Sequence, residues 1–301
     1  MRILLTGATG QIGSAVLPAL LARGHEVVAL VRSDNSAAVV EKAGAVVVRG
    51  DLFDARVLAE AARGADGVVH VASPGDETSA QADEAVLDAV LPALDGTGKP
   101  YVHTGGIWVH GSSPQPIDET TPYDPPQLTA WRVPLGERVL AASGLRGIVV
   151  APGIVHGDGG GLPADLAGGP RFSTSDGDAL VFPGTGEQHW TPVHVDDIGV
   201  LYALAVESAP PGTYLFAAGG PSLPVRAIAE AASRGQGLGG RVAPEGDDAT
   251  RDRLGLLGEA LLLDQRASGA RAQELLGWRP RGTSLFDDLT SGSYAQPGRG
   301  R

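Results

Sequence analysis

The sequence contains no cysteine and very little lysine. Of its 301 residues, 23 are Lys or Arg, and only Lys42 and Lys99 among these are lysine. The absence of cysteine excludes a thiol nucleophile, a CxxC redox pair and a thiolate metal site. Enrichment in Ala, Gly and Arg with few lysines is typical of a coding sequence rich in G and C.

Long apolar runs are absent as well. No stretch approaches the roughly 18 apolar residues that mark a membrane-spanning helix. The chain begins with a strand-like apolar run that is far too short for the core of a signal peptide. We therefore expect a cytoplasmic protein that does not bind a membrane.

Positive charge is outnumbered by negative charge. The formal net charge is −12, which makes nucleic acid an unfavourable partner. The 44 glycines and 22 prolines follow no repeating period and lie between apolar runs, as in an ordered globular fold. We expect a small-molecule substrate, and the sequence does not define an oligomeric state.

Short runs rich in Val, Ile and Leu alternate with helical segments in the first half of the chain. Nearly continuous apolar runs are typical of strands buried on both faces of a sheet. The predicted strands are residues 3–6, 27–31, 45–48, 67–71, 101–104 and 147–151. The predicted helices are residues 12–23, 37–43, 55–62, 83–94 and 129–143. Strict alternation predicts an α/β fold with a doubly wound parallel sheet of the Rossmann type.

The composition changes after Pro152, where a segment rich in Gly, Pro, Ser and Asp covers residues 153–187. The length of this segment favours a lid that covers a bound substrate. The alternative is a loop that only extends over the surface. We expect a dinucleotide-binding portion over 1–152. Residues 153–291 are expected to form mainly a smaller substrate lobe, with some segments returning to the sheet, and 292–301 a disordered tail.

A glycine-rich segment directly follows the first predicted strand and opens the first predicted helix. Gly7, Gly10 and Gly13 suit a tight turn, a close approach of pyrophosphate to the backbone, and close packing of helix on strand. The free N–H groups of the helix start attract the anion. The predicted contacts in this turn are Gly7, Thr9, Gly10, Gln11, Ile12 and Gly13.

The end of the second predicted strand distinguishes the two nicotinamide cofactors. An acidic residue there favours NAD, whereas this chain has Arg32 and Ser33, which suit a 2′-phosphate. We therefore predict NADP, as NADPH. Asp34 leaves NAD possible, and the alternative for Arg32 is a solvated surface side chain.

Two further strand ends carry predicted cofactor contacts. Asp51 and Leu52 follow the third strand, where the carboxylate can meet the adenine amino group. Val71, Ala72 and Ser73 follow the fourth strand and can line the two riboses. Helix capping or turn formation is the alternative role for Asp51 and Ser73.

Several segments along the chain together resemble the short-chain dehydrogenase/reductase superfamily, in its extended and atypical branch of epimerase/dehydratase-like proteins. The resemblance lies in residues 6–13, 50–52, 151–157, 193–198 and 274–280. It implies the Rossmann fold. It also implies nicotinamide contacts at Pro152, Gly153, Ile154 and Val155.

The same resemblance implies a catalytic set that this chain lacks. Family members carry a Ser or Thr after the fifth strand, then a Tyr and a Lys four residues apart on the next helix, which exchange a proton beside hydride transfer. The hydroxyl position falls on the glycines at 105–106. The two possible alignments place the Tyr and Lys positions at Thr129 and Val133, or at Trp131 and Leu135.

Three nearby residues are the remaining catalytic candidates. Thr104 is the nearest hydroxyl, and His110 has a side chain that titrates near neutral pH. Arg132 suits a ribose or carbonyl contact but cannot donate a proton, because its guanidinium stays charged. The alternatives are a solvated or hydrogen-bonded histidine and a surface salt bridge.

Aromatic side chains and histidines suggest a substrate site. Trp108 and Trp131 suit a wall for a flat substrate, with core packing as the alternative. The other predicted substrate residues are His156, His189 and Trp190. The spacing of the histidines matches no metal motif, so we predict no metal site.

These features favour an NAD(P)H-dependent ketoreductase of atypical mechanism. Hydride transfer chiefly needs a well-placed nicotinamide and carbonyl, so reduction can survive the loss of the tyrosine. The chain also resembles ketoreductases that tailor angucyclinones, which implies an aromatic polyketide antibiotic intermediate as substrate. The alternatives are a non-redox isomerase related to epimerases and an NADP-binding sensor protein.

Overall fold

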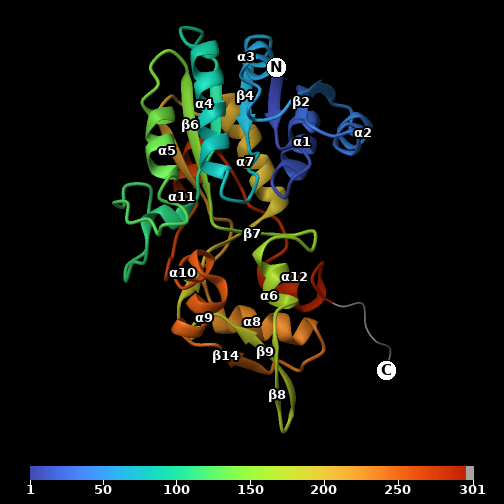
Figure 1. Cartoon of the computed structure of the whole chain (residues 1–301), viewed down its shortest axis with the longest axis vertical. Helices are drawn as coiled ribbons and strands as arrows, with labels where there is room; N and C mark the ends of the chain where they lie inside the picture. Colours follow the sequence, from blue (N-terminus) through green and yellow to red (C-terminus); the bar gives the residue numbers. More distant parts are fainter. Residues whose placement is uncertain (296–301) are drawn as a thin grey trace.

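The computed structural model describes residues 1–295 and consists of two parts (Figure 1). A large parallel sheet with helices on both faces forms the upper part in this view. A smaller lobe of helices and short strands lies below it, and β7 (Ile154–His156) runs between the two. The lobe comes almost entirely from the second half of the chain.

Seven parallel strands form the central sheet, in the order β12-β6-β5-β4-β1-β2-β3. Their bounds are β1 (Arg2–Thr6), β2 (Glu26–Val31), β3 (Val46–Arg49), β4 (Gly67–His70), β5 (Pro100–Thr104), β6 (Arg146–Pro152) and β12 (Thr213–Ala217). This order and the parallel pairing confirm the predicted doubly wound α/β fold.

Helices cover both faces of the sheet because successive strand residues point to opposite sides. Ile3 and Leu5 of β1 pack in one core with α1 (Gly13–Ala22), while Leu4 packs in the other with α4 (Ser79–Leu94). The first core also holds α2 (Asp34–Lys42), α7 (Val195–Ser208) and α11 (Ala270–Leu276). The second also holds α3 (Ala55–Arg63) and α5 (Arg132–Leu140).

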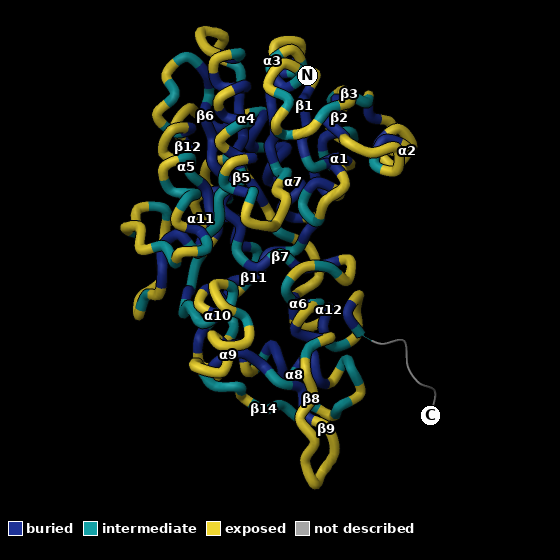
Figure 2. The backbone as a smooth tube through the Cα atoms, viewed as in Figure 1, coloured by how far each residue is buried: buried dark blue, intermediate teal, exposed yellow. Residues whose placement is uncertain are grey.

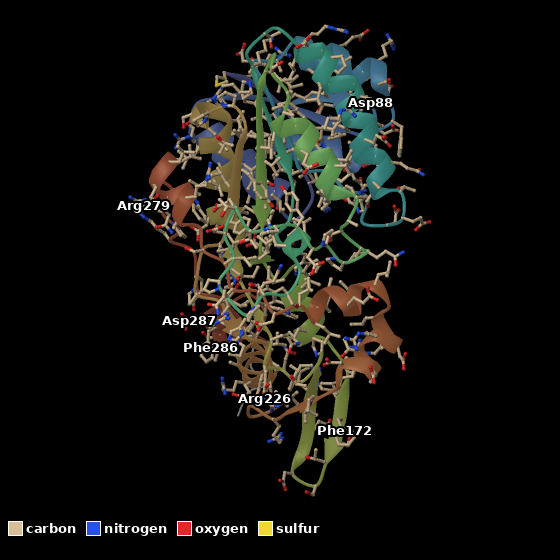
Figure 3. The ribbon with its side chains drawn as sticks, turned by 90° about the vertical axis from the view of Figure 1, so that its left-hand side faces the viewer. Asp88, Phe172, Arg226, Arg279, Phe286 and Asp287 are labelled. Atoms are coloured by element: carbon tan, nitrogen blue, oxygen red, sulfur yellow. The ribbon has the colours of Figure 1, made fainter. Side chains whose placement is uncertain are left out.

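The second lobe has a separate apolar core, seen as buried segments below β7 in Figure 2. It contains α6 (Leu162–Ala167), α8 (Val225–Gly235), α9 (Asp247–Leu254), α10 (Leu256–Leu261) and α12 (Leu285–Ser291). Its three-stranded sheet consists of β8 (Arg171–Thr174), β9 (Gly177–Phe182) and β14 (Val242–Pro244). Phe172, on the β8–β9 hairpin, is 59% exposed (Figure 3).

Short elements connect the two parts. They are the 3-10 helix η1 (Ile107–His110) and the strands β10 (His189–Trp190), β11 (Pro192–His194) and β13 (Leu223–Pro224). β11 pairs in parallel with β7, and β10 pairs antiparallel with β13. Residues 153–187, expected as a lid or a surface excursion, form β7, α6 and the β8–β9 hairpin.

The chain end departs from the expectation of a disordered tail beginning at residue 292. Tyr294 is only 7% exposed, and its hydroxyl accepts a hydrogen bond from the backbone N–H of Gly157 at 2.7 Å. The expectation is therefore wrong for residues 292–295, because an aromatic side chain there packs into the second lobe. The rest of the predicted tail, 296–301, lies outside the described residues. Within 1–295, no helix has the length and apolar character needed to cross a membrane.

Candidate functional site

The glycine-rich turn is pressed between α1 and the segment after β4. Gly7 has a φ of +77°, and a Cβ added there would lie 2.6 Å from backbone atoms of Ala72. A Cβ on Gly13 would lie 1.9 Å from the carbonyl oxygen of Gly7. The turn therefore tolerates no side chain at either position, which fits a backbone cradle for a dinucleotide at the start of α1.

The residues predicted to select the cofactor lie between β2 and α2. Ser33 caps α2, since its hydroxyl accepts a hydrogen bond from Ser36 N at 3.2 Å. The carboxylate of Asp34, which left NAD possible, accepts a hydrogen bond from Arg49 at 2.6 Å. The Arg32 side chain is exposed at the same edge.

The positive charge of Arg32 affects Asp76 in the loop that follows β4. Hydrogen bonds from Thr78 lower the pKa of Asp76, and the positive charge of Arg32 adds a smaller lowering effect. Arg32 and the loop after β4 therefore flank the same end of the sheet. The contact of Arg32 with a 2′-phosphate stays a prediction.

Local roles account for three other predicted contacts. The Asp51 carboxylate accepts a hydrogen bond from Phe53 N at 2.8 Å, and Leu52 packs against the core under α3 and α4. The Ser73 hydroxyl donates to the Ser79 hydroxyl at 3.3 Å. Their adenine and ribose contacts stay predictions.

The predicted nicotinamide segment links the sheet to the second lobe. A Cβ on Gly153 would lie 2.2 Å from the carbonyl oxygen of Thr191, so only glycine fits this crossing. Ile154 N donates to the same oxygen at 2.7 Å. Pro152 ends β6 and Val155 lies in β7, so this segment lies at the junction of the two parts.

A loop over residues 157–161 lies against the glycine-rich turn. Gln11 donates from its side-chain amide to Gly157 O at 3.2 Å, and a Cβ on Gly160 would lie 2.0 Å from the Gln11 side-chain oxygen. The Tyr294 hydroxyl donates to Gly160 O at 2.7 Å. The position of Tyr294 was missed from the sequence, because nothing in the pattern links residue 294 to residue 160.

Two of the three catalytic candidates meet at the end of β5. The Thr104 hydroxyl donates to the carbonyl oxygen of His70 at 2.7 Å, and Arg132 donates to the carbonyl oxygen of Thr104 at 3.2 Å. The Tyr202 hydroxyl, from α7, lies 2.7 Å from the Thr104 hydroxyl. Burial raises the pKa of Tyr202 well above its ordinary value, so the phenol stays protonated.

A buried network of polar side chains contacts Arg132. Asp83 of α4 lies 3.1 Å from His70 Nε2 and 3.9 Å from the Arg132 guanidinium, and His70 Nδ1 lies 2.6 Å from the Thr6 hydroxyl. Burial alone would raise the pKa of Asp83, but the His70 hydrogen bond and nearby positive charge lower it overall. The ionised carboxylate thus fixes Arg132 at the end of β5.

His103 completes this network without completing a metal site. Its Nε2 atom lies 3.7 Å from the Asp83 carboxylate, and burial lowers its pKa to about 3, so the ring is neutral. Nitrogens of His70 and His103 and an Asp83 oxygen all lie within 4.8 Å of one another. The Arg132 cation beside the same carboxylate opposes a second cation there.

His110 has hydrogen-bond partners other than Thr104 and Arg132. Its ring nitrogens lie 2.9 Å from the carbonyl oxygen of Thr121 and 3.1 Å from the Tyr214 hydroxyl. Burial lowers the pKa of His110. Both nitrogens are engaged, so proton donation would require these contacts to break; the role of His110 stays a prediction.

Neither alignment provides a phenol and an amine at the Tyr and Lys positions, although Thr129 carries a hydroxyl at one of them. The helix predicted over 129–143 is shorter, since α5 begins at Arg132 after a proline-rich loop. Thr129 is buried. Val133 lines a crevice of about 20 Å³ with the glycines at 105–106 and Arg132. This volume holds about one water molecule.

The predicted substrate tryptophans make separate contacts, and their role as a wall stays a prediction. Arg132 lies over the Trp131 ring, 4.3 Å from its centroid, whereas Trp108 packs beside the second-lobe core. Within residues 1–295 no ring contact joins these two tryptophans. Trp190 is buried in the second lobe and donates to Leu261 O at 3.1 Å.

The two remaining histidines predicted to contact substrate lie against aspartate carboxylates. His189 Nδ1 lies 2.8 Å from the Asp264 carboxylate, and His156 Nδ1 lies 3.5 Å from the Asp288 carboxylate. Burial lowers the pKa of His156. Their substrate roles stay predictions.

Comparison with known proteins relates the chain to nicotinamide-binding proteins. A family described as NAD(P)H-binding matches residues 7–175. An uncharacterised protein of Schizosaccharomyces pombe is 30% identical over 301 residues, 98% of this chain and 100% of that protein. The 4-hydroxy-2-methyl-3-oxo-4-farnesyl-3,4-dihydroquinoline-1-oxide ketoreductase of Stigmatella aurantiaca is 29% identical over 323 residues, 99% of this chain and 92% of the relative.

A solved structure shares the fold. The double mutant of a dTDP-glucose 4,6-dehydratase from Streptomyces venezuelae, with NAD and DAU bound, matches with a TM-score of 0.77. It is 23% identical and the match covers 99% of this chain and 98% of that one. The predictions of an NAD(P) cofactor and of an NAD(P)-dependent oxidoreductase are confirmed by these matches.

Proposed function

Since this chain belongs to the NAD(P)H-binding family and has the epimerase/dehydratase-like fold, we propose that it is an NADPH-dependent ketoreductase that works without a Tyr-Lys pair. The observation that carries the proposal is the contact between Thr104 and Arg132 at the end of β5, where the Arg132 guanidinium donates to the Thr104 carbonyl oxygen. These two groups offer a proton donor and a fixed cation where the predicted nicotinamide segment begins the crossing to the second lobe.

The residues present fit the cofactor. The side-chain-free turn at Gly7 and Gly13 would hold the pyrophosphate, and Arg32 would bind the 2′-phosphate of NADPH. When bound, NADPH supplies the hydride for a ketone carbonyl. Arg132, held by Asp83, would bind the nicotinamide ribose or orient the carbonyl.

Thr104 would hold the proton that completes the reduction. Its hydroxyl would turn from the carbonyl oxygen of His70 to the substrate oxygen and give it the proton. The Tyr202 hydroxyl, 2.7 Å away, would then donate a hydrogen bond to the Thr104 oxygen until water restores the Thr104 proton. Tyr202 is fully buried and acts only through Thr104. Burial raises the pKa of Tyr202 despite the opposing effects of the Thr104 hydrogen bond and the Arg132 charge, so Tyr202 keeps its proton and acts as a hydrogen-bond donor.

An aromatic ketone of the polyketide antibiotic kind is the proposed substrate class. The ketoreductase of Stigmatella aurantiaca is named for a farnesylated dihydroquinoline oxide, and this similarity supports an aromatic substrate. A phenolic ketone could also donate a proton from its own hydroxyl, which would reduce the demand on the protein.

An NADP-binding sensor is the second candidate. It is favoured by Val133, which leaves the Lys position without an amine, and by the glycines at 105–106, which leave the position after the fifth strand without a hydroxyl. A sensor would bind NADPH tightly without consuming it. An epimerase-like isomerase is less favoured, because it needs a base to begin its cycle.

The test is a panel of aromatic ketones incubated with NADPH or NADH while the absorbance of the reduced nicotinamide is followed. We expect NADPH oxidation, with kcat about a hundredfold lower in Thr104→Val and partly restored in Thr104→Ser. No oxidation with any ketone, together with tight NADPH binding, would establish the sensor instead. Full activity in Thr104→Val would assign the proton to water or to the substrate.

A further inference from the structure

The second lobe encloses a cavity of about 150 Å³ that no predicted contact uses except Trp190. Its walls come from α6, β9, α9 and α10. Most of the lining side chains are apolar: Leu162, Leu166, Pro170, Val181, Pro183, Trp190, Leu254, Leu257 and Leu261.

The polar groups in this wall are already engaged. The Trp190 N–H donates to Leu261 O, and Arg253 donates to both carboxylate oxygens of Glu245. Asp165, at the start of α6, adds a negative charge to the wall. A diphosphate would therefore meet one carboxylate and a guanidinium that a glutamate already neutralises, which opposes its binding.

The cavity is connected along the chain to both sides of the cofactor site. α6 begins directly after the 157–161 loop, which lies against Gln11 of the glycine-rich turn. Trp190 precedes Thr191, whose carbonyl oxygen accepts the hydrogen bond of Ile154 beside Gly153. Two walls of the cavity are therefore continuous with segments that contact the glycine-rich turn and the predicted nicotinamide segment.

We propose that this cavity is the substrate subsite for an apolar group of about the size of benzene, such as an aryl ring or a short branched alkyl chain. An apolar cavity of about 150 Å³ holds a benzene-sized molecule. That this cavity serves a substrate rests on the proposed ketoreductase function. The proposal predicts that this lobe binds an apolar ketone and not a sugar nucleotide.

The test is an NMR titration of the full-length, cofactor-free protein with toluene, and in parallel with dTDP. We expect saturable toluene binding that dTDP does not displace. Leu257→Trp should weaken it about tenfold or more, since the indole fills the cavity. Leu256→Trp is the matched control, because Leu256 is the preceding residue of the same helix and is 39% exposed; it should leave toluene binding unchanged.

A second variant keeps the test decisive if Leu257→Trp does not fold. Leu257→Ala enlarges the cavity and should raise the affinity for naphthalene relative to toluene. Absence of saturable toluene binding, displacement by dTDP, equal effects of the two Trp variants, or an unchanged naphthalene preference would each overturn the proposal. Toluene binding as expected without NADPH oxidation by any ketone would leave the subsite standing and refute the ketoreductase alone.

Discussion

The two sides of the proposed site differ in how they are built. At the end of β5, Thr104, Arg132 and Asp83 form a polar network in which each group is positioned by another. In the second lobe, the cavity at Trp190 and Leu257 is mostly apolar, and its Arg253 guanidinium is paired with Glu245. On the proposed function, the sheet would supply the chemistry and the lobe would select the compound. Variants on the sheet side should therefore change catalysis and cofactor binding without changing toluene binding.

The largest effect is expected on the glycine-rich turn. Gly13→Ala would place a methyl group 1.9 Å from the Gly7 carbonyl oxygen, so we expect a loss of about 3 kcal/mol or more in the free energy of unfolding. NADPH binding should be lost with it. Thermal unfolding and a fluorescence titration with NADPH measure the two effects.

Gly10→Ala is the matched control within the same turn. Its added Cβ would lie 3.4 Å from the same oxygen, which is near ordinary van der Waals contact. Gly10→Ala should lower the free energy of unfolding by less than half as much as Gly13→Ala. Equal losses in the two variants would mean that the turn responds to helix backbone changes in general and not to this close contact.

The next largest effect is expected from Asp83→Asn. Removing the carboxylate leaves Arg132 and His70 without their partner, which should cost about 3 kcal/mol of stability and raise the KM for NADPH. Asp88→Asn on the same helix is the control, because the Asp88–Arg138 pair is exposed (Figure 3). It should cost less than about 1 kcal/mol.

The pH dependence of stability tests whether the charge of Asp83 causes the loss expected in Asp83→Asn. The lowered pKa of Asp83 means that its ionised form stabilises the fold above the unfolded-state pKa of about 3.9. This contribution is lost as the pH falls through the lower folded-state pKa. Asp83→Asn should therefore flatten the acid limb of stability against pH, and an unchanged limb would refute the role of this carboxylate.

Tyr202→Phe tests whether the Tyr202 hydroxyl contributes to catalysis through Thr104. The variant keeps the buried ring and removes the hydroxyl that lies 2.7 Å from Thr104, so kcat should fall about tenfold with little change in KM. The kcat of the variant should also change with pH differently from that of the native enzyme. Equal pH profiles with reduced stability would make Tyr202 a packing residue only.

The sequence predicted the cofactor half better than the catalytic half for a physical reason. The strand pattern and the spacing of Gly7 and Gly13 depend on residues near one another in the chain. The meeting of Thr104 with Tyr202 depends on a strand and a helix 98 residues apart. Likewise, Asp83 carried no signal, because its burial follows from packing α4 on β4 and β5 and not from any local motif.

The smallest expected effect concerns the choice between the two cofactors. Arg32→Ala should raise the KM for NADPH about tenfold and leave that for NADH nearly unchanged, since only NADPH offers a 2′-phosphate to the guanidinium. Arg49→Ala is a useful companion, because it frees the Asp34 carboxylate from its ion pair. That variant should improve NADH relative to NADPH, as a carboxylate at this edge accepts hydrogen bonds from the ribose. Equal effects of Arg32→Ala on both cofactors would show that the edge of β2 binds the adenosine without reading its phosphate.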